Sequence, residues 1–174
     1  MQNPEVVKGE LEKNMIKNRY LIGRHLDSGS NGMIYKIVDN QNQKVPLVIK
    51  LSEDCMAFSQ EINHTKKIYK SGAKNCSGIS QTPQVVDYGL INQIKHGKET
   101  LLAYMIIPRY GHNLDTFFTK QNQHLNRQSI LDLGLRIISM LQRCHEAGLV
   151  YNDLKLDNIL FGYNTKFPKT LGES

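Results

Sequence analysis

The five long β-rich runs of this 174-residue chain come before residue 108, and its strongest helical pattern comes after it. Each run is rich in β-branched or aromatic residues and is bounded by polar or Gly-containing turns, which is typical of strands. A helix from about Ala57 to Tyr69 interrupts them. We therefore expect an α+β fold with a five-stranded sheet, one helix packed with it and a helical second part. The expected strands are Tyr20 to Leu26, Met33 to Asp39, Val45 to Leu51, Val85 to Ile91 and Leu101 to Ile107.

The segment from Asn126 to about Ala147 predicts a long helix, after a short helix at Leu114 to Phe118. Asn126 can cap its start and Gly148 can end it. Apolar residues cover well over half of its circumference, so it must be buried on several sides. The chain offers only short segments for this, so we expect either a partner protein to cover the helix or residues to be missing. The apolar residues are Ile130, Leu131, Leu133, Leu135, Ile137, Ile138, Met140 and Leu141.

The net charge of +6 is spread along the chain and interleaved with acids, which is typical of solvated surfaces. It favours acidic peptides or nucleotide phosphates as ligands. Nucleic acid is disfavoured, because neither a basic stripe nor an aromatic platform accompanies the charge. No apolar run approaches the roughly 20 residues that span a bilayer, and the leader at residues 1–18 is too charged for a secretory signal. We expect an intracellular protein, cytoplasmic or nuclear, with no membrane contact.

The stretch from Leu149 to Leu160 places an Asp, a Lys and an Asn between two apolar runs. We expect the first run, Leu149-Val150, to be a strand. The carboxylate of Asp153 could orient an attacking hydroxyl, the ammonium of Lys155 could neutralise phosphoryl oxygens, and the amide oxygen of Asn158 could bind Mg²⁺. The alternative is a polar turn whose side chains satisfy local backbone groups.

Residues Tyr151 to Asn158 resemble the catalytic loop of eukaryotic protein kinases, His-Arg-Asp-Leu-Lys-x-x-Asn. The upstream motifs follow the order of that family: a Gly-containing turn at 27–32, Lys50 on a Leu-Val-Ile-Lys strand, Glu61 on the next helix, and a hinge. The segment Met105 to Leu114 is similar to the hinge of the casein kinase one group and the vaccinia-related kinases. The resemblance implies a serine/threonine protein kinase-like protein with a five-stranded antiparallel N-lobe sheet, one helix and a helical C-lobe.

The resemblance also implies a role for each matching residue. Asp153 and Lys155 would be catalytic, and Asn158 would bind the metal. Lys50 would reach the ATP phosphates and Glu61 would orient it, unless the helix register brings Thr65 to that place. The implied cofactors are ATP and Mg²⁺, and the implied partner is a protein substrate. The residues expected to bind ATP are Ser28, Gly29, Ser30, Gly32, Ile34, Val48, Lys50, Glu61, Ile107, Pro108, Tyr110 and Leu160.

The chain departs from the family pattern at several places. Asp27 stands where the family has its first loop Gly, and Asn152 replaces an Arg. The Asp-Phe-Gly segment and the activation loop are missing after Asn158, where Glu173 is the only acid. We therefore expect a kinase truncated after the catalytic loop and, taken alone, feeble or inert; the alternative is an inert binding or scaffold module that docks on a partner. The expected division is a leader at 1–18, an N-lobe at 19–107, a hinge at 108–113 and a partial C-lobe at 114–174.

Overall fold

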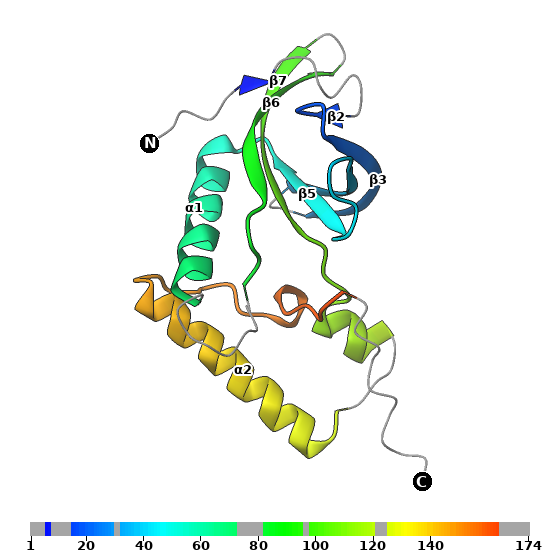
Figure 1. Cartoon of the computed structure of the whole chain (residues 1–174). Coiled ribbons are helices and arrows are strands. Elements are labelled where there is room, and N and C mark those ends of the chain that lie inside the picture. Colours follow the sequence, from blue (N-terminus) through cyan, green and yellow to red (C-terminus); the bar gives the residue numbers. More distant parts are fainter. Residues whose placement is uncertain are drawn as a thin grey trace. The chain divides into compact units, whose positions relative to one another are not determined.

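The computed structural model describes residues 15–29, 32–72, 82–95, 98–120 and 125–163, together with the backbone of Val6–Val7. The chain separates into two compact units. The first consists of residues 1–69 and 83–109, and the second of residues 70–82 and 110–174. The first unit holds the sheet, and the second holds the long helix and the loop that follows it (Figure 1).

The sheet has seven strands among the described residues, in the order β1-β6-β7-β5-β4-β3-β2. The five longer strands pair antiparallel, which confirms the predicted sheet. The sequence did not reveal the two-residue strands at its edges, of which β1 runs parallel to β6. Because β2 precedes residue 19, the sheet begins inside the predicted leader. The strands are β1 (Val6–Val7), β2 (Met15–Ile16), β3 (Tyr20–Gly29), β4 (Gly32–Asp39), β5 (Leu47–Ser52), β6 (Asp87–Lys95) and β7 (Lys98–Pro108).

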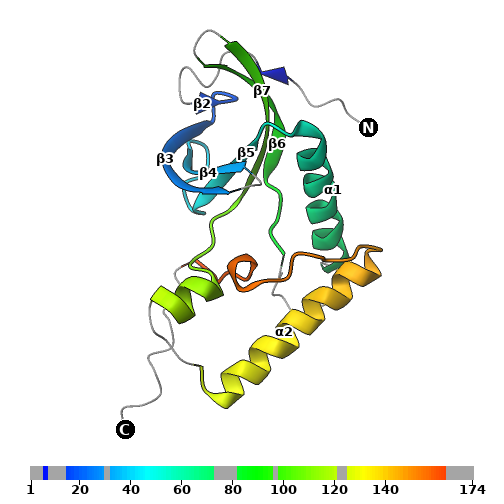
Figure 2. The ribbon, with the colours of Figure 1, turned by 180° about the vertical axis from the view of Figure 1, so that it is seen from behind.

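Helix α1 (Cys55–Gly72) covers one face of this sheet, as Figures 1 and 2 show from opposite sides. Asp54 caps its start, since its Oδ1 accepts a hydrogen bond of 3.0 Å from the Ala57 amide. Phe58 and Ile62, one helical turn apart, pack on Ala103 and Met105 of β7. We call this side of the sheet the α1 face.

The other side of the sheet, the core face, curls around the main hydrophobic cluster. Its buried side chains come from six strands, β2 to β7, so the cluster joins all the strands of the sheet except β1. Each large apolar side chain buried in this way contributes about 1.5–3 kcal/mol. The members are Ile16, Tyr20, Ile37, Leu47, Ile49, Leu51, Ile91, Leu102, Tyr104 and Ile106.

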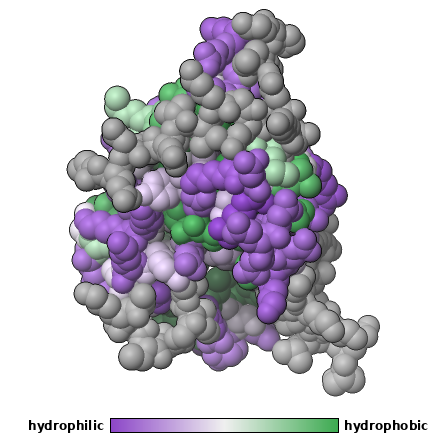
Figure 3. All heavy atoms as spheres, turned by 45° about the horizontal axis from the view of Figure 1, so that its top comes forward, coloured by the Kyte–Doolittle hydropathy of each residue, from purple (hydrophilic) through white to green (hydrophobic). Residues whose placement is uncertain are grey.

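Asp39, at the end of β4, is a buried acid with only 4% of its surface exposed. It accepts two hydrogen bonds from the Arg19 guanidinium, of 2.8 Å from Nε and 2.7 Å from Nη2. The Gln41 amide adds a third, at 2.9 Å. The Arg19 contact, followed by the backbone amides, lowers the pKa of the Asp39 carboxyl to about 2. On the face drawn in Figure 3, hydrophilic side chains lie among smaller hydrophobic areas.

The pKa of Asp39 predicts an acid-sensitive contribution to stability. The folded value lies below the roughly 3.9 of an unfolded chain, so the contribution is present above about pH 4 and is lost as the pH falls toward 2. At about 1.4 kcal/mol per pKa unit, the full contribution is about 2.5 kcal/mol, of which about 2 kcal/mol is lost by pH 2. We expect the difference in free energy of unfolding between wild type and Asp39→Asn to narrow by about that amount from pH 5 to pH 2. Urea titrations at each pH measure it, and a constant difference would contradict the assignment.

In the second unit, helix α2 (Arg127–Glu146) confirms the predicted long helix. The Asn126 side chain accepts a 2.8 Å hydrogen bond from the Ser129 amide, as a cap does. Gly148 closes the helix with a φ of 66°. The predicted strand at Leu149-Val150 is wrong, because the Leu149 amide bonds back to the Cys144 carbonyl at 2.8 Å and so completes the helix end.

The segment after residue 110 forms backbone hydrogen bonds with the residues that directly follow the predicted catalytic loop. It contains helical residues at 114–115 and the π-helical turn η2 (Thr116–Lys120), which confirms a short helix there. Backbone hydrogen bonds of 2.9 Å join Gly111 to Phe161, Phe161 to His112, and Leu114 to Ile159. The Phe117 ring, 2% exposed, lies 5.3 Å from the Phe161 ring. Among the described residues, no helix is long and apolar enough to cross a membrane.

Candidate nucleotide and phosphotransfer site

Cross-strand pairing collects predicted ATP-binding residues on the α1 face of the first unit. Residues directly opposite each other in antiparallel strands point to the same side of a sheet. Ile34 pairs with Lys50, which pairs with Met105, and in the next row Val48 pairs with Ile107. Met105 packs under α1, so its row partners Lys50 and Ile34 lie on this face. Val48 and Ile107, each two residues along the strand from a member of that row, point to the same side. The result is an apolar surface of three aliphatic side chains beside one ammonium group.

The Lys50 ammonium binds the Glu61 carboxylate at both oxygens, at 2.7 Å and 2.8 Å. The side chains are 17% and 38% exposed. The ammonium also lies 5.4 Å from the centre of the Phe58 ring. This contact was not predicted from the sequence, although Phe58 stands one turn before Glu61 and therefore on the same side of the helix.

The alternative helix register, with Thr65 as the partner, does not occur in the structure. The Thr65 hydroxyl instead donates a 2.8 Å hydrogen bond to the Glu61 carbonyl within α1. Burial of Phe58 and Ile62 against the sheet sets this register, because Glu61 lies beside them on the helix. Any role of the pair toward a nucleotide stays a prediction.

The Gly-containing turn joins β3 to β4, and Ser30 within it lies outside the described residues. Gly29 and Gly32, both within this turn, are cross-strand partners at the end of β3 and the start of β4. Gly32 has a φ of 122°, and a Cβ there would collide with the Leu51 carbonyl, so glycine is required by the backbone alone. Ser28 pairs with Met33 and so lies on the core face. Its hydroxyl is within 2.7 Å of His25 Nε2.

In the second unit, the predicted catalytic residues form one small cluster. The Asn158 amide nitrogen donates to the Asp153 carboxylate at 2.7 Å and to its carbonyl at 2.8 Å. Lys155 Nζ lies 3.2 Å from the other carboxylate oxygen. The helical turn η3 (Leu156–Asn158) bends the chain so that these residues meet. The contacts with Asn158 and then Lys155 lower the pKa of the Asp153 carboxyl, which is therefore ionised at neutral pH.

Three further predicted ATP-binding residues are divided between the two units. Pro108, the last residue of β7, pairs with Leu47 in the first unit. Tyr110 begins the next part of the second unit, where Leu160 pairs with Asn113 in an isolated bridge. Leu160 is half exposed. Their role toward a nucleotide stays a prediction.

Comparison with known proteins identifies kinases as relatives over most of the chain. No protein-family model matches it. The chain is 26% identical over 162 residues to a fowlpox virus protein named "Probable serine/threonine-protein kinase FPV212", covering 89% of the chain and 52% of that protein. The chain is serine/threonine protein kinase-like. It is also 25% identical over 143 residues to the casein kinase I homolog RAG8 of Kluyveromyces lactis, covering 82% of the chain and 24% of that protein.

These relatives agree with the resemblance to the casein kinase I and vaccinia-related kinase group. The B1 kinase of vaccinia virus is 26% identical over 148 residues, which covers 83% of the chain and 47% of that kinase. The kinase-like chain thus spans about half the length of the two poxvirus relatives and about a quarter of the yeast one.

Proposed function

We propose that this chain takes part in phosphoryl transfer from Mg-ATP to a serine or threonine hydroxyl of a protein. The observation that carries the proposal is the Lys50–Glu61 ion pair beside the aliphatic surface of Ile34, Val48 and Ile107. Nucleotide sites combine these properties, because a purine base buries apolar area while its phosphates need a fixed cation.

In the first unit, Glu61 holds the Lys50 side chain in one orientation through two hydrogen bonds. A charge fixed in this way stabilises phosphate oxygens without the cost of ordering a free side chain. The apolar residues on the same face bind the base and keep water from it. In this assignment Lys50 reaches the α and β phosphates.

In the second unit, Asp153 is held in place and ionised by Asn158 and Lys155. A carboxylate in this state can orient an acceptor hydroxyl and take its proton. The Asn158 amide nitrogen faces Asp153, so its amide oxygen is directed away and suits Mg²⁺, which prefers oxygen ligands. When bound, the metal would neutralise phosphate charge. Lys155 would steady the transferred phosphoryl group.

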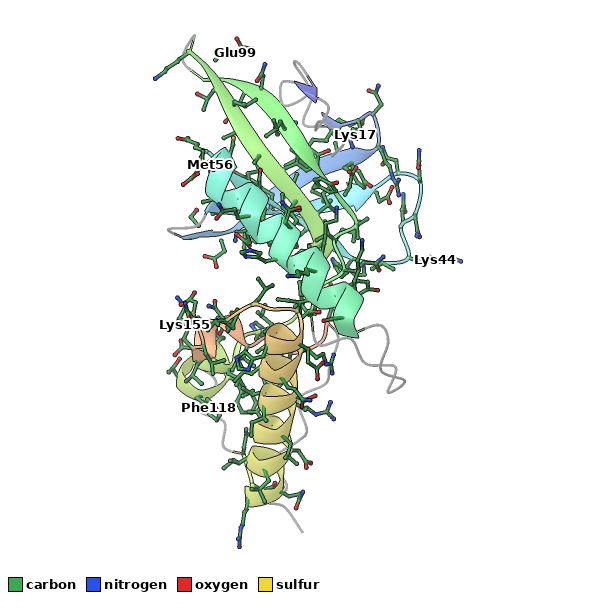
Figure 4. The ribbon with its side chains drawn as sticks, turned by 90° about the vertical axis from the view of Figure 1, so that its left-hand side faces the viewer. Lys17, Lys44, Met56, Glu99, Phe118 and Lys155 are labelled. Atoms are coloured by element: carbon green, nitrogen blue, oxygen red, sulfur yellow. The ribbon has the colours of Figure 1, made fainter. Side chains whose placement is uncertain are left out.

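Replacing Lys50 tests nucleotide binding. At Mg-ATP concentrations about a hundredfold above Kd, we expect wild type to gain about 2.7 kcal/mol, seen as a shift of Tm by several degrees. Lys50→Met removes the ammonium but keeps most of the apolar side chain, and we expect the shift to vanish. Lys44→Met is the control, because Lys44 is exposed in the turn before β5 (Figure 4). An undiminished shift in Lys50→Met would remove Lys50 from the site.

Replacing Asp153 tests phosphoryl transfer. With labelled Mg-ATP and casein as a general acceptor, we expect Asp153→Asn to lower the transfer rate at least about a hundredfold, the usual scale for loss of a catalytic base. Its Mg-ATP thermal shift should stay as in wild type, which separates catalysis from binding. Equal rates for the variant and wild type, or no transfer by wild type, would contradict the catalytic assignment.

We infer a docking or scaffold module as the second candidate function, because an apolar stripe on α2 is exposed in the described structure. Leu131, Leu135 and Ile138 follow one side of the helix at spacings of four and three residues, and they are 52%, 66% and 63% exposed. An exposed stripe of large aliphatic side chains favours an apolar protein surface as its partner.

The stripe predicts that the purified chain associates through α2. We expect the double variant Leu131→Gln, Leu135→Gln to lower the average mass in sedimentation equilibrium and to keep the Mg-ATP thermal shift. Arg136→Gln is the control, since it changes an exposed polar position of the same helix. An unchanged mass in the double variant would exclude the stripe as the contact surface.

A further inference from the structure

The carboxylate of Asp27 lies on the face that carries Lys50. A register shift in the β3–β4 pairing inserts one residue between His25 and Asp27, so Asp27 rather than Leu26 lies opposite Ile34. Ile34 in turn lies opposite Lys50 on β5. Asp27, Ile34 and Lys50 therefore form one cross-strand row on the α1 face. Neighbouring strands lie about 4.8 Å apart, so the backbones of Asp27 on β3 and Lys50 on β5 are about 10 Å from each other across the strands.

The Asp27 carboxylate also holds a backbone amide next to the Gly-containing turn. Its Oδ1 accepts a hydrogen bond of 2.8 Å from the Ser28 amide. Backbone amides in glycine-containing turns are the groups that bind phosphate oxygens in many nucleotide sites. At Ser28 an anionic oxygen of the chain itself already makes that bond.

The charges of this row are unfavourable for a phosphate. Glu61 binds the Lys50 ammonium through both of its oxygens, and Asp27 adds a second carboxylate, so the three groups together carry an excess of one negative charge. Lys36 lies in the next row, opposite Val48, and both it and Asp27 are exposed, so solvent screens both charges. Asp27 nevertheless lies nearer the Gly-containing turn, because it pairs with Ile34 and Lys36 is two residues farther along β4. A nucleoside without phosphates would meet only the aliphatic side chains of this face.

We propose that Asp27 sets the ligand specificity of this face: it disfavours phosphorylated nucleosides unless a divalent cation accompanies them. The inference rests on the proposed nucleotide binding and adds a residue that determines which form of the ligand binds. Without a divalent cation, adenosine binds at least as tightly as ATP. With Mg²⁺, which offsets the phosphate charge, the preference moves toward ATP.

Calorimetric titration of the whole chain with adenosine and with ATP, each in EDTA and in excess Mg²⁺, tests this specificity. Asp27→Asn removes the charge but keeps an oxygen acceptor for the Ser28 amide. We expect ATP affinity in EDTA to rise about three- to tenfold, as Coulomb's law gives for one charge near phosphates in a water-like dielectric. Adenosine affinity should stay the same, which also shows that the variant folds. The increase in ATP affinity caused by Asp27→Asn should become smaller in high salt, which screens the charge of Asp27 in wild type.

Glu99→Gln is the matched control, because it removes one carboxylate charge at the far end of the β6–β7 hairpin of the same unit (Figure 4). It should leave the ratio of ATP to adenosine affinity unchanged. Two results would contradict the specificity role of Asp27 and leave nucleotide binding intact, provided that adenosine binds. In the first, Asp27→Asn has the same ratio of ATP to adenosine affinity as wild type. In the second, Glu99→Gln raises that ratio as much as Asp27→Asn does. If neither ligand binds to any variant under either condition, the proposed function is wrong and the inference falls with it.

Discussion

The first unit depends on the register in which β5 lies between β4 and β7. Alternate residues of β5 enter opposite sides of the sheet, so Ile49 and Leu51 join the core cluster while Lys50 reaches the α1 face. A slip by one residue would exchange these sides and place an ammonium group among fully buried aliphatic side chains. The cost of burying an unpaired charge is several kcal/mol. The hydrophobic core therefore holds the charged residue of the candidate site in position.

The Lys50–Glu61 pair joins the sheet to α1 by charge, and Phe58 and Ile62 join them by packing. Both contacts need the same helix register, so the apolar stripe and the ion pair support each other. Asp27 adds a carboxylate to this face at the position where kinases carry a glycine, which gives the surface a different charge balance from the one that the family resemblance implies. In the second unit the polar groups bind each other, with Asp153 held between Asn158 and Lys155.

Much of the fold could be predicted because its signals are local. The five long strands, α1 and the Asn126 cap of α2 follow from periodicity, turn residues and capping chemistry in short stretches of chain. The prediction failed in two places. Leu149-Val150 has the apolar pattern of a strand, but the end of α2 takes the Leu149 amide. The two-residue strands are too short to carry a pattern of their own, and they form because longer strands offer an edge.

The sequence by itself determined which chemical groups this protein carries and the order in which they occur, because motif spacing is a property of the chain. It determined the kinase-like succession of turn, Lys50, Glu61 and the loop at Asp153. Only the tertiary structure decided which groups share a face. In the tertiary structure Lys50 pairs with Glu61 and not with Thr65, and Ser28 lies on the core face. Asp27 lies on the same face of the sheet as Lys50. Those outcomes depend on the helix register of α1, on strand register and on a one-residue bulge, which are set by contacts between segments and leave no mark in any single one.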